Sequence, residues 1–122
     1  MRLAVIVFLF LATPAAADDA AIALGNALAQ KNCTTCHAIG INDASPIQDA
    51  PPFRDIAVRY DLIDLEDSLN EGVATEHPLM PDWQMTPEQA HALASFVMSL
   101  APAGKLKSEN EPGSQPALTA LP

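Results

Sequence analysis

The spacing of apolar and polar positions predicts a small all-helical domain. Residues 18–32 (DDAAIALGNALAQKN) begin with acidic side chains, carry isoleucine and leucine among alanines, and end near Lys31. Acidic residues at the amino end and a basic residue at the carboxyl end suit the helix dipole, so this segment predicts a helix. Residues 87–100 predict another, because Thr86 can cap a helix that has Pro87 at its first position.

Shorter helices and loops are predicted between these two segments. Residues 55–60 suit a helical turn, and residues 65–71 suit a short helix with Asp64 as its N-cap and Gly72 as its stop. Glycine, proline, asparagine and aspartate interrupt the remaining sequence, which predicts loops over residues 38–53 and 73–85. No segment shows the strict alternation that is typical of a strand.

The two ends of the chain differ in composition from its middle. Residues 1–17 contain a basic residue at Arg2, a short apolar run and small residues up to Ala17, which predicts a secretory signal peptide cleaved after Ala17. The apolar run is shorter than the roughly 20 residues that span a bilayer. Residues 102–122 are polar and rich in proline, and predict a disordered tail. We therefore expect a soluble periplasmic protein with one folded domain over residues 18–101.

The mature chain is expected to be strongly acidic. Without residues 1–17, five basic residues stand against 15 acidic ones, a formal charge of −10. This charge disfavours binding to nucleic acid and to anionic membranes, and favours partners with basic docking patches. Aromatic residues make up 5% of the sequence, so a domain of this size lacks large core side chains and something else must fill its interior.

The segment CTTCH, from Cys33 to His37, holds both cysteines of the chain. Pairs at this spacing occur in structural disulfides, thiol–disulfide exchange sites, zinc sites and covalent haem sites. A disulfide closing so short a loop adds little stability, an exchange site normally follows a strand, and zinc needs further ligands. Haem attachment uses both thiols and the adjacent histidine and requires export, so we favour it over the other three.

Around this motif, from about residue 25 to residue 100, the sequence resembles the class I c-type cytochromes. In that family a glycine eight residues before the first cysteine lets the first and last helices cross closely, and Gly25 matches it. An apolar and an aromatic residue three apart on the last helix match Leu93 and Phe96. A proline after the motif matches Pro51, and a methionine followed by proline matches Met80.

The resemblance implies a small cytochrome c fold, in which crossed terminal helices, short helices and loops wrap around one haem. Cys33 and Cys36 would attach that haem covalently. His37 and Met80 would be the axial ligands of its iron, and the carbonyl of Pro51 would accept a hydrogen bond from His37.

Other side chains compete with Met80 for the iron. Met85 ranks second because it is close along the chain but lacks the following proline, and His77 ranks third. Met98 lies within the last predicted helix, where we expect it to pack in the core.

A few polar side chains are candidates for contact with the haem propionates. Trp83 follows the ligand segment, and we expect it to lie against the haem with its indole N–H toward a propionate. Arg54 and Arg59 suit either a propionate or a solvated ion pair of low value with Asp55 or Asp61.

An iron with histidine and methionine in both axial positions cannot readily bind a substrate, so catalysis is disfavoured and no catalytic residue is expected. We expect a monomeric one-electron carrier that exchanges electrons with soluble or membrane-bound redox proteins. The alternatives are the haem subunit of a dehydrogenase or peroxidase system, or a gas or redox sensor in which Met80 is displaceable.

Overall fold

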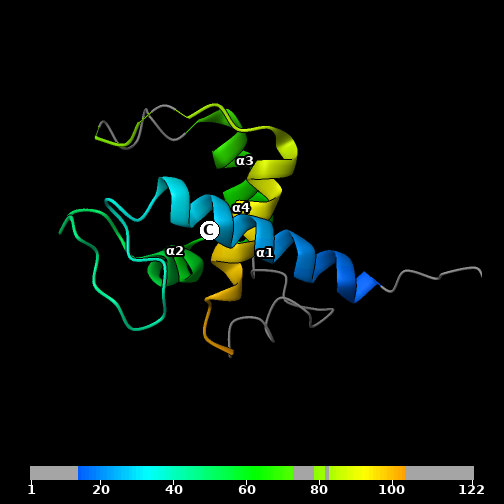
Figure 1. Ribbon diagram of the computed structural model, residues 1–122, viewed down its shortest axis with the longest axis horizontal. Coiled ribbons are helices and arrows are strands. Elements are labelled where there is room, and N and C mark those ends of the chain that lie inside the picture. The colour runs from blue at the N-terminus through cyan, green and yellow to red at the C-terminus, as the bar shows by residue number, and fades with distance from the viewer. Residues whose placement is uncertain (1–13, 73–78, 82, 104–122) are drawn as a thin grey trace, which may run out of the picture.

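The computed structural model describes residues 14–72, 79–81 and 83–103. Within these residues the chain forms helices only, which confirms the all-helical fold class (Figure 1). In chain order these are α1 Pro14–Asn32, α2 Phe53–Arg59, α3 Leu62–Glu71 and α4 Pro87–Ser99. The expectations for residues 1–13, for His77 and for the tail from residue 104 onward lie outside the described residues.

The two long helices, α1 and α4, cross at Gly25 (Figure 1). A Cβ atom at this position would lie 2.6 Å from the carbonyl carbon of Ala92 and 2.7 Å from Cβ of Phe96, and it would overlap the Ala92 carbonyl oxygen. Such distances are too short for any side chain, so glycine allows the two backbones to approach. Ala29, one turn further along α1, is fully buried in the same contact region.

Helix α4 begins as the sequence predicts. The Thr86 side chain accepts a hydrogen bond from the Gln89 amide at 3.2 Å, and the Gln89 side chain accepts one from the Thr86 amide at 3.0 Å. This reciprocal capping box satisfies two amides that the helix itself cannot bond. The helix ends at Ser99, one residue before the predicted end, with Leu100 as its C-cap.

Helix α3 begins three residues earlier than the sequence analysis places it. Asp61, not Asp64, is the N-cap: its backbone is extended and its carboxylate accepts a hydrogen bond from the Asp64 amide at 2.8 Å. The predicted stop is confirmed, because Gly72 follows the last turn with φ 89°, a conformation that favours glycine.

Helices α1 and α2 also begin before their predicted starts, at Pro14 and Phe53. Proline precedes or opens each of them, and its fixed φ is compatible with the first helical turn. In α1 the alanines that follow Pro14 have the highest helix propensity, so the helix runs through the predicted cleavage point at Ala17.

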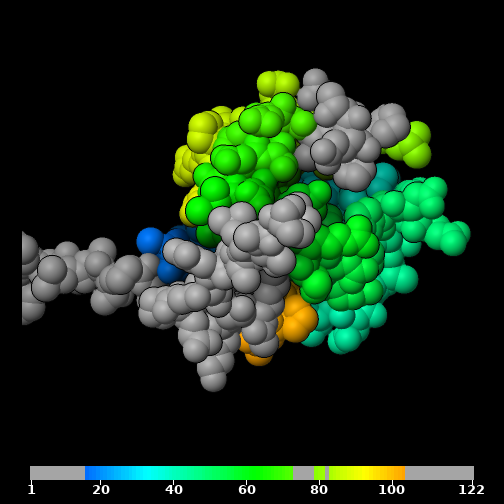
Figure 2. Space-filling view, turned by 180° about the vertical axis from the view of Figure 1, so that it is seen from behind, coloured from blue at the N-terminus to red at the C-terminus, as the bar shows by residue number. Residues whose placement is uncertain are grey.

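The short helices pack against α4 on either side of the α1 crossing. The Phe53 ring of α2 meets the Phe96 ring of α4 edge to face, with centroids 6.4 Å apart. Between α3 and α4, Nδ1 of the exposed His91 lies 2.9 Å from a Glu66 carboxylate oxygen. Figure 2 shows the opposite face, where α2 and the preceding loop of residues 38–52 form one continuous part of the surface.

Among the described residues, none of the helices combines the length and the apolar character needed to span a membrane.

Replacing Gly25 with alanine is expected to lower the free energy of unfolding by about 1–3 kcal/mol, because the new methyl group overlaps the α4 backbone. In an uncrowded helix the same change raises stability by roughly 0.5–1 kcal/mol, so the sign of the effect tests the crossing. Urea unfolding followed by far-ultraviolet circular dichroism measures it. Ala27→Gly, on the exposed side of α1, is the control. It should lower the free energy of unfolding only by the difference in helix propensity between alanine and glycine, about 1 kcal/mol. A Gly25→Ala variant more stable than the unmodified protein would contradict the close crossing.

Candidate functional site

A cavity of about 760 Å³ lies between the end of α1, the loop before α2, α3 and the segment before α4. All of the site residues proposed from the sequence line this cavity: Cys33, Cys36, His37, Pro51, Met80 and Trp83. They come from separate segments of the chain, so it is the fold that brings them together. The volume is within the roughly 300–1,000 Å³ that is usual for cofactor sites.

The CTTCH segment extends α1 by a further turn. The Cys33 amide donates to the Ala29 carbonyl at 2.9 Å, and the His37 amide donates to the Cys33 carbonyl at 2.8 Å. Residues four apart on a helical turn share a face, which is why Cys33 and His37 both line the cavity. Cys36 lies between them and is half-buried.

Cys33 and Cys36 form no disulfide with each other, and Cys33 is poorly suited to act as a thiolate. Burial, with a smaller contribution from neighbouring Cys36, raises the pKa of the Cys33 thiol to about 11. The pair also lies at the carboxyl end of α1, where the helix dipole disfavours negative charge. Exchange sites show the opposite arrangement, with a lowered thiol pKa at a helix amino end, so this geometry does not fit a thiol–disulfide exchange centre.

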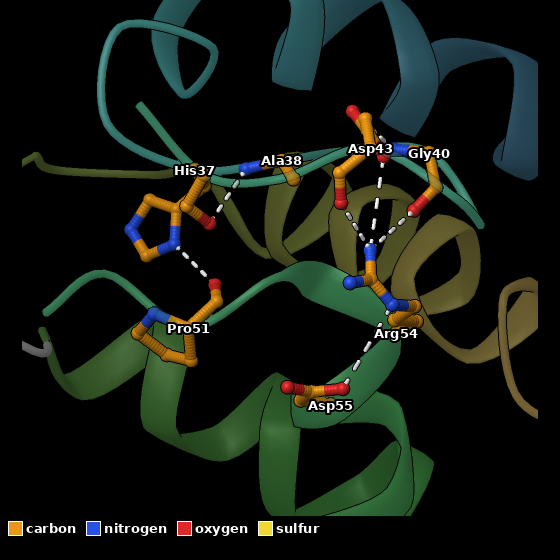
Figure 3. Close-up of polar contacts among 8 residues, drawn as sticks. His37, Ala38, Gly40, Asp43, Pro51, Arg54 and Asp55 are labelled. Atoms are coloured by element: carbon orange, nitrogen blue, oxygen red, sulfur yellow. Dashed lines mark hydrogen bonds and ion pairs between the residues drawn. The ribbon is translucent and has the colours of Figure 1, made fainter. Parts of the chain in front are cut away.

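His37 is fixed by the carbonyl of Pro51. The distance between His37 Nδ1 and the Pro51 oxygen is 2.7 Å (Figure 3). A carbonyl oxygen can only accept a hydrogen bond, so Nδ1 carries the proton and Nε2 keeps its lone pair. The Phe53 ring packs beside the imidazole, with centroids 5.4 Å apart. This is the arrangement that metal-binding histidines use, with one nitrogen oriented by a carbonyl and the other free to coordinate.

The wall formed by the segment before α4 contains two thioether groups. Met80 and Met85 both line the cavity, and both are half-buried. Trp83 lies between them in the sequence and lines the same wall. Met98, expected in the core, is 6% exposed and is not among the residues that line the cavity. Met80 therefore lies on the same cavity as His37, as an iron ligand would, and Met85, which ranked second from the sequence, lines that cavity too.

Helix α2 contributes side chains that are not among the site residues proposed from the sequence, although Arg59 was a candidate propionate partner. Phe53, Ile56 and Arg59 line the cavity, with Tyr60 directly after them. Their spacing of three along a helix puts them on one face, but the sequence does not say that this face, and not that of Arg54, meets the cavity. Arg54 lies on a different face of α2 and contacts the loop instead.

The lining has the chemistry that a large flat apolar group requires. Among the described residues, most lining side chains are aliphatic, aromatic or thioether groups, and the charged ones are Asp49 and Arg59. Among the described residues no large side chain is fully buried elsewhere in the core, which is built mainly from alanine, leucine and phenylalanine. A large apolar group bound in the cavity would therefore complete the core, and His37, Cys33 and Cys36 lie on the cavity wall to hold it.

The family model for cytochrome c matches residues 22–101. The chain belongs to the cytochrome c family. Cytochrome c-552 from Bradyrhizobium diazoefficiens is 30% identical to this cytochrome c over 78 residues, which cover 64% of this chain and 73% of that protein. Comparison with solved structures gives no significant match.

Membership of this family decides between the four interpretations of the CTTCH segment. Members of the cytochrome c family are electron-carrier proteins with a covalently bound c-type haem, and Cys33 and Cys36 fit the attachment motif. The structure is compatible with this cofactor because the thiols and His37 lie on the wall of an apolar cavity of suitable size.

Replacing both Cys33 and Cys36 with alanine is expected to abolish covalent haem attachment to this cytochrome c. Acid–acetone extraction should leave the colour with the unmodified polypeptide and none with the double variant, which should also accumulate poorly because its interior is unfilled. Thr35→Ala, at an exposed position between the cysteines, is the matched control and should retain its haem. Haem that is extractable from the unmodified protein would contradict covalent attachment.

Proposed function

We propose that this cytochrome c is a periplasmic one-electron carrier whose covalent haem is ligated by His37 and Met80. The observation that supports it most directly is the 2.7 Å contact between His37 Nδ1 and the Pro51 carbonyl. That contact leaves Nε2 as a ligand on the wall of a cavity that Met80 also lines. The mature domain is proposed to span residues 18–101, after cleavage of residues 1–17, with residues 102–122 as a tail.

The proposed function divides between the haem, which carries the electron, and the side chains that hold the haem and set its reduction potential. When bound, a c-type haem supplies an iron that alternates between the ferrous and ferric states. Cys33 and Cys36 tether it, and His37 is a ligand of fixed tautomer. The neutral thioether of Met80 favours ferrous iron and so raises the reduction potential. The apolar side chains of the lining would pack against the bound haem.

This ligand set also argues that the protein is not an enzyme. If His37 and Met80 both hold the iron, no position on it would be left for a substrate. The carrier function is therefore favoured over that of a dehydrogenase or peroxidase subunit, and over a sensor with a displaceable Met80.

We propose that the redox partners carry basic patches. The formal charge of −10 on the mature chain attracts such surfaces over long range. Close contact would then involve apolar side chains at the cavity, since Ile47 and Leu79 line it and are 45% and 84% exposed. A small interface of this kind suits the brief encounters of a monomeric electron carrier.

Replacing Met80 with alanine is expected to open the sixth coordination position of the iron. The reduced variant should bind carbon monoxide, and its reduction potential should fall because the thioether no longer stabilises ferrous iron. Met85→Ala is the matched control from the same wall and should bind no carbon monoxide. Carbon monoxide binding by the unmodified protein would favour the sensor, and binding by Met85→Ala alone would transfer the ligand role to Met85.

The proposed electrostatic steering predicts opposite salt effects for oppositely charged oxidants. Oxidation of the reduced protein by a tripositive cobalt(III) complex should slow as ionic strength rises from about 0.01 to 0.15 M, while oxidation by hexacyanoferrate(III) should accelerate. Over that range the screening length falls from roughly 30 to 8 Å. Stopped-flow kinetics measure both rates.

Two aspartate variants test whether acidic side chains near the cavity contribute more to the salt dependence than distant ones. Asp49→Asn, at the cavity, should weaken the salt dependence more than Asp18→Asn, which lies roughly 20 Å along α1 from the cysteines. Rates that stay flat with salt for both oxidants would show that the net charge does not act at the haem.

A further inference from the structure

Arg54, in the first turn of α2, ties down the loop that follows the haem-binding motif (Figure 3). Its Nη1 donates a hydrogen bond to the Asp43 carbonyl at 2.7 Å and a longer one to the Gly40 carbonyl at 3.4 Å. The same nitrogen lies 3.7 Å from the Asp43 carboxylate, which in turn accepts a bond from the Gly40 amide at 3.3 Å. One guanidinium group therefore closes the turn of residues 40–43 and fastens it to α2.

This contact is the last of three that join residues 37–43 to residues 51–54. The first is the bond from His37 Nδ1 to the Pro51 carbonyl at 2.7 Å. The second is the bond from the Phe53 amide to the Ala38 carbonyl at 2.9 Å. Arg54 adds the third, so the two segments are fastened side by side at successive positions; Figure 3 shows the first and third of these contacts.

The loop between these segments needs such support. It comprises residues 38–52, and ordering a loop of this length costs conformational entropy at every residue. Most of its side chains are exposed or half-buried, so burial contributes little to holding it. Its position therefore depends on polar contacts, of which that between Arg54 and the Asp43 carbonyl is as short, at 2.7 Å, as the His37 contact itself.

We propose that Arg54 is a positioning residue for the axial histidine: by holding the loop against α2 it keeps the Pro51 carbonyl on His37 Nδ1. This inference rests on the proposed function of His37 as iron ligand. Arg54 does not line the haem cavity; it lines a smaller cavity of about 340 Å³, together with Val58 of α2. Any effect of Arg54 on the geometry of His37 therefore acts through the loop and not through direct contact with the cavity.

Arg54 could affect the iron by positioning the loop or through its charge alone, and these two routes predict opposite shifts of the reduction potential when Arg54 is replaced. A hydrogen bond from Nδ1 to a carbonyl makes the imidazole a stronger donor, which favours ferric iron. Loosening that bond should therefore raise the potential. Removing a positive charge near the iron would instead favour ferric iron and lower the potential.

The test compares Arg54→Gln and Arg54→Lys with the unmodified protein, all loaded with haem. Glutamine removes the charge, whereas lysine keeps it but lacks the planar fork that serves several oxygens at once. Asp55→Asn is the matched control, because the Asp55 carboxylate lies 4.0 Å from Arg54 Nε and, among the described residues, makes no hydrogen bond to the loop. The readouts are the reduction potential and the exchange rate of the His37 Nδ1 proton, followed by NMR in the ferrous protein.

We expect both Arg54 variants to have a higher potential than the unmodified protein. Their Nδ1 proton should exchange roughly five- to tenfold faster, as expected for loss of one hydrogen bond of typical strength, with the smaller change in Arg54→Lys. Asp55→Asn should leave the exchange rate unchanged. If Arg54→Gln does not accumulate, the lysine variant carries the test.

Two results would overturn the inference. One is an exchange rate that is unchanged in both Arg54 variants. The other is a potential that falls in Arg54→Gln and stays constant in Arg54→Lys, which would mean that only charge acts. Failure of the proposed function looks different, because the unmodified protein would then lack a haem coordinated by His37.

Discussion

The close crossing of α1 and α4 at Gly25 determines where the haem-binding segment can lie. Because no side chain separates the two backbones there, the middle of α1 lies directly against Ala92 and Phe96 of α4, and this contact fixes the direction in which the carboxyl end of α1 leaves the crossing. Cys33, at the end of α1, therefore lines the same cavity as Leu93 and Val97 of α4. A bulkier residue at position 25 would move the attachment segment away from the wall against which a cofactor packs.

The second constraint is a shortage of large side chains. The core of the described residues relies heavily on alanine, for example Ala29, Ala57 and Ala94, each with no exposed surface. Small side chains allow helices to approach but bury little apolar area. A covalent haem in the cavity would supply the missing area, so that the cofactor is both the redox centre and the largest part of the core. The loop of residues 38–52 then has a defined task, which is to present the Pro51 carbonyl to His37.

The sequence predicted the features that depend on local patterns or on matched motifs. The capping box at Thr86, the stop at Gly72 and the contact between His37 and Pro51 are all found where they were expected. The predicted start of α3 was wrong by three residues. Asp61 and Asp64 are the same residue type and equally suitable as N-caps, and only the backbone conformation distinguishes them.

The separate tasks of Arg54 and Arg59 could not be predicted. Sequence alone does not say which face of a seven-residue helix meets the cavity and which meets a folded loop. The contacts of Arg54 in particular depend on how residues 40–43 turn, and that turn has no strong local signal of its own.

X-ray absorption at the iron edge tests the central claim most directly, since it identifies the atoms bound to the metal in the intact protein. If the iron lies between His37 and Met80, both the ferrous and the ferric protein should show pyrrole and imidazole nitrogens together with a single sulfur neighbour, and the Met80→Ala variant should lose that sulfur. An iron surrounded only by nitrogen or oxygen in the unmodified protein, or a sulfur that persists in Met80→Ala, would contradict the account.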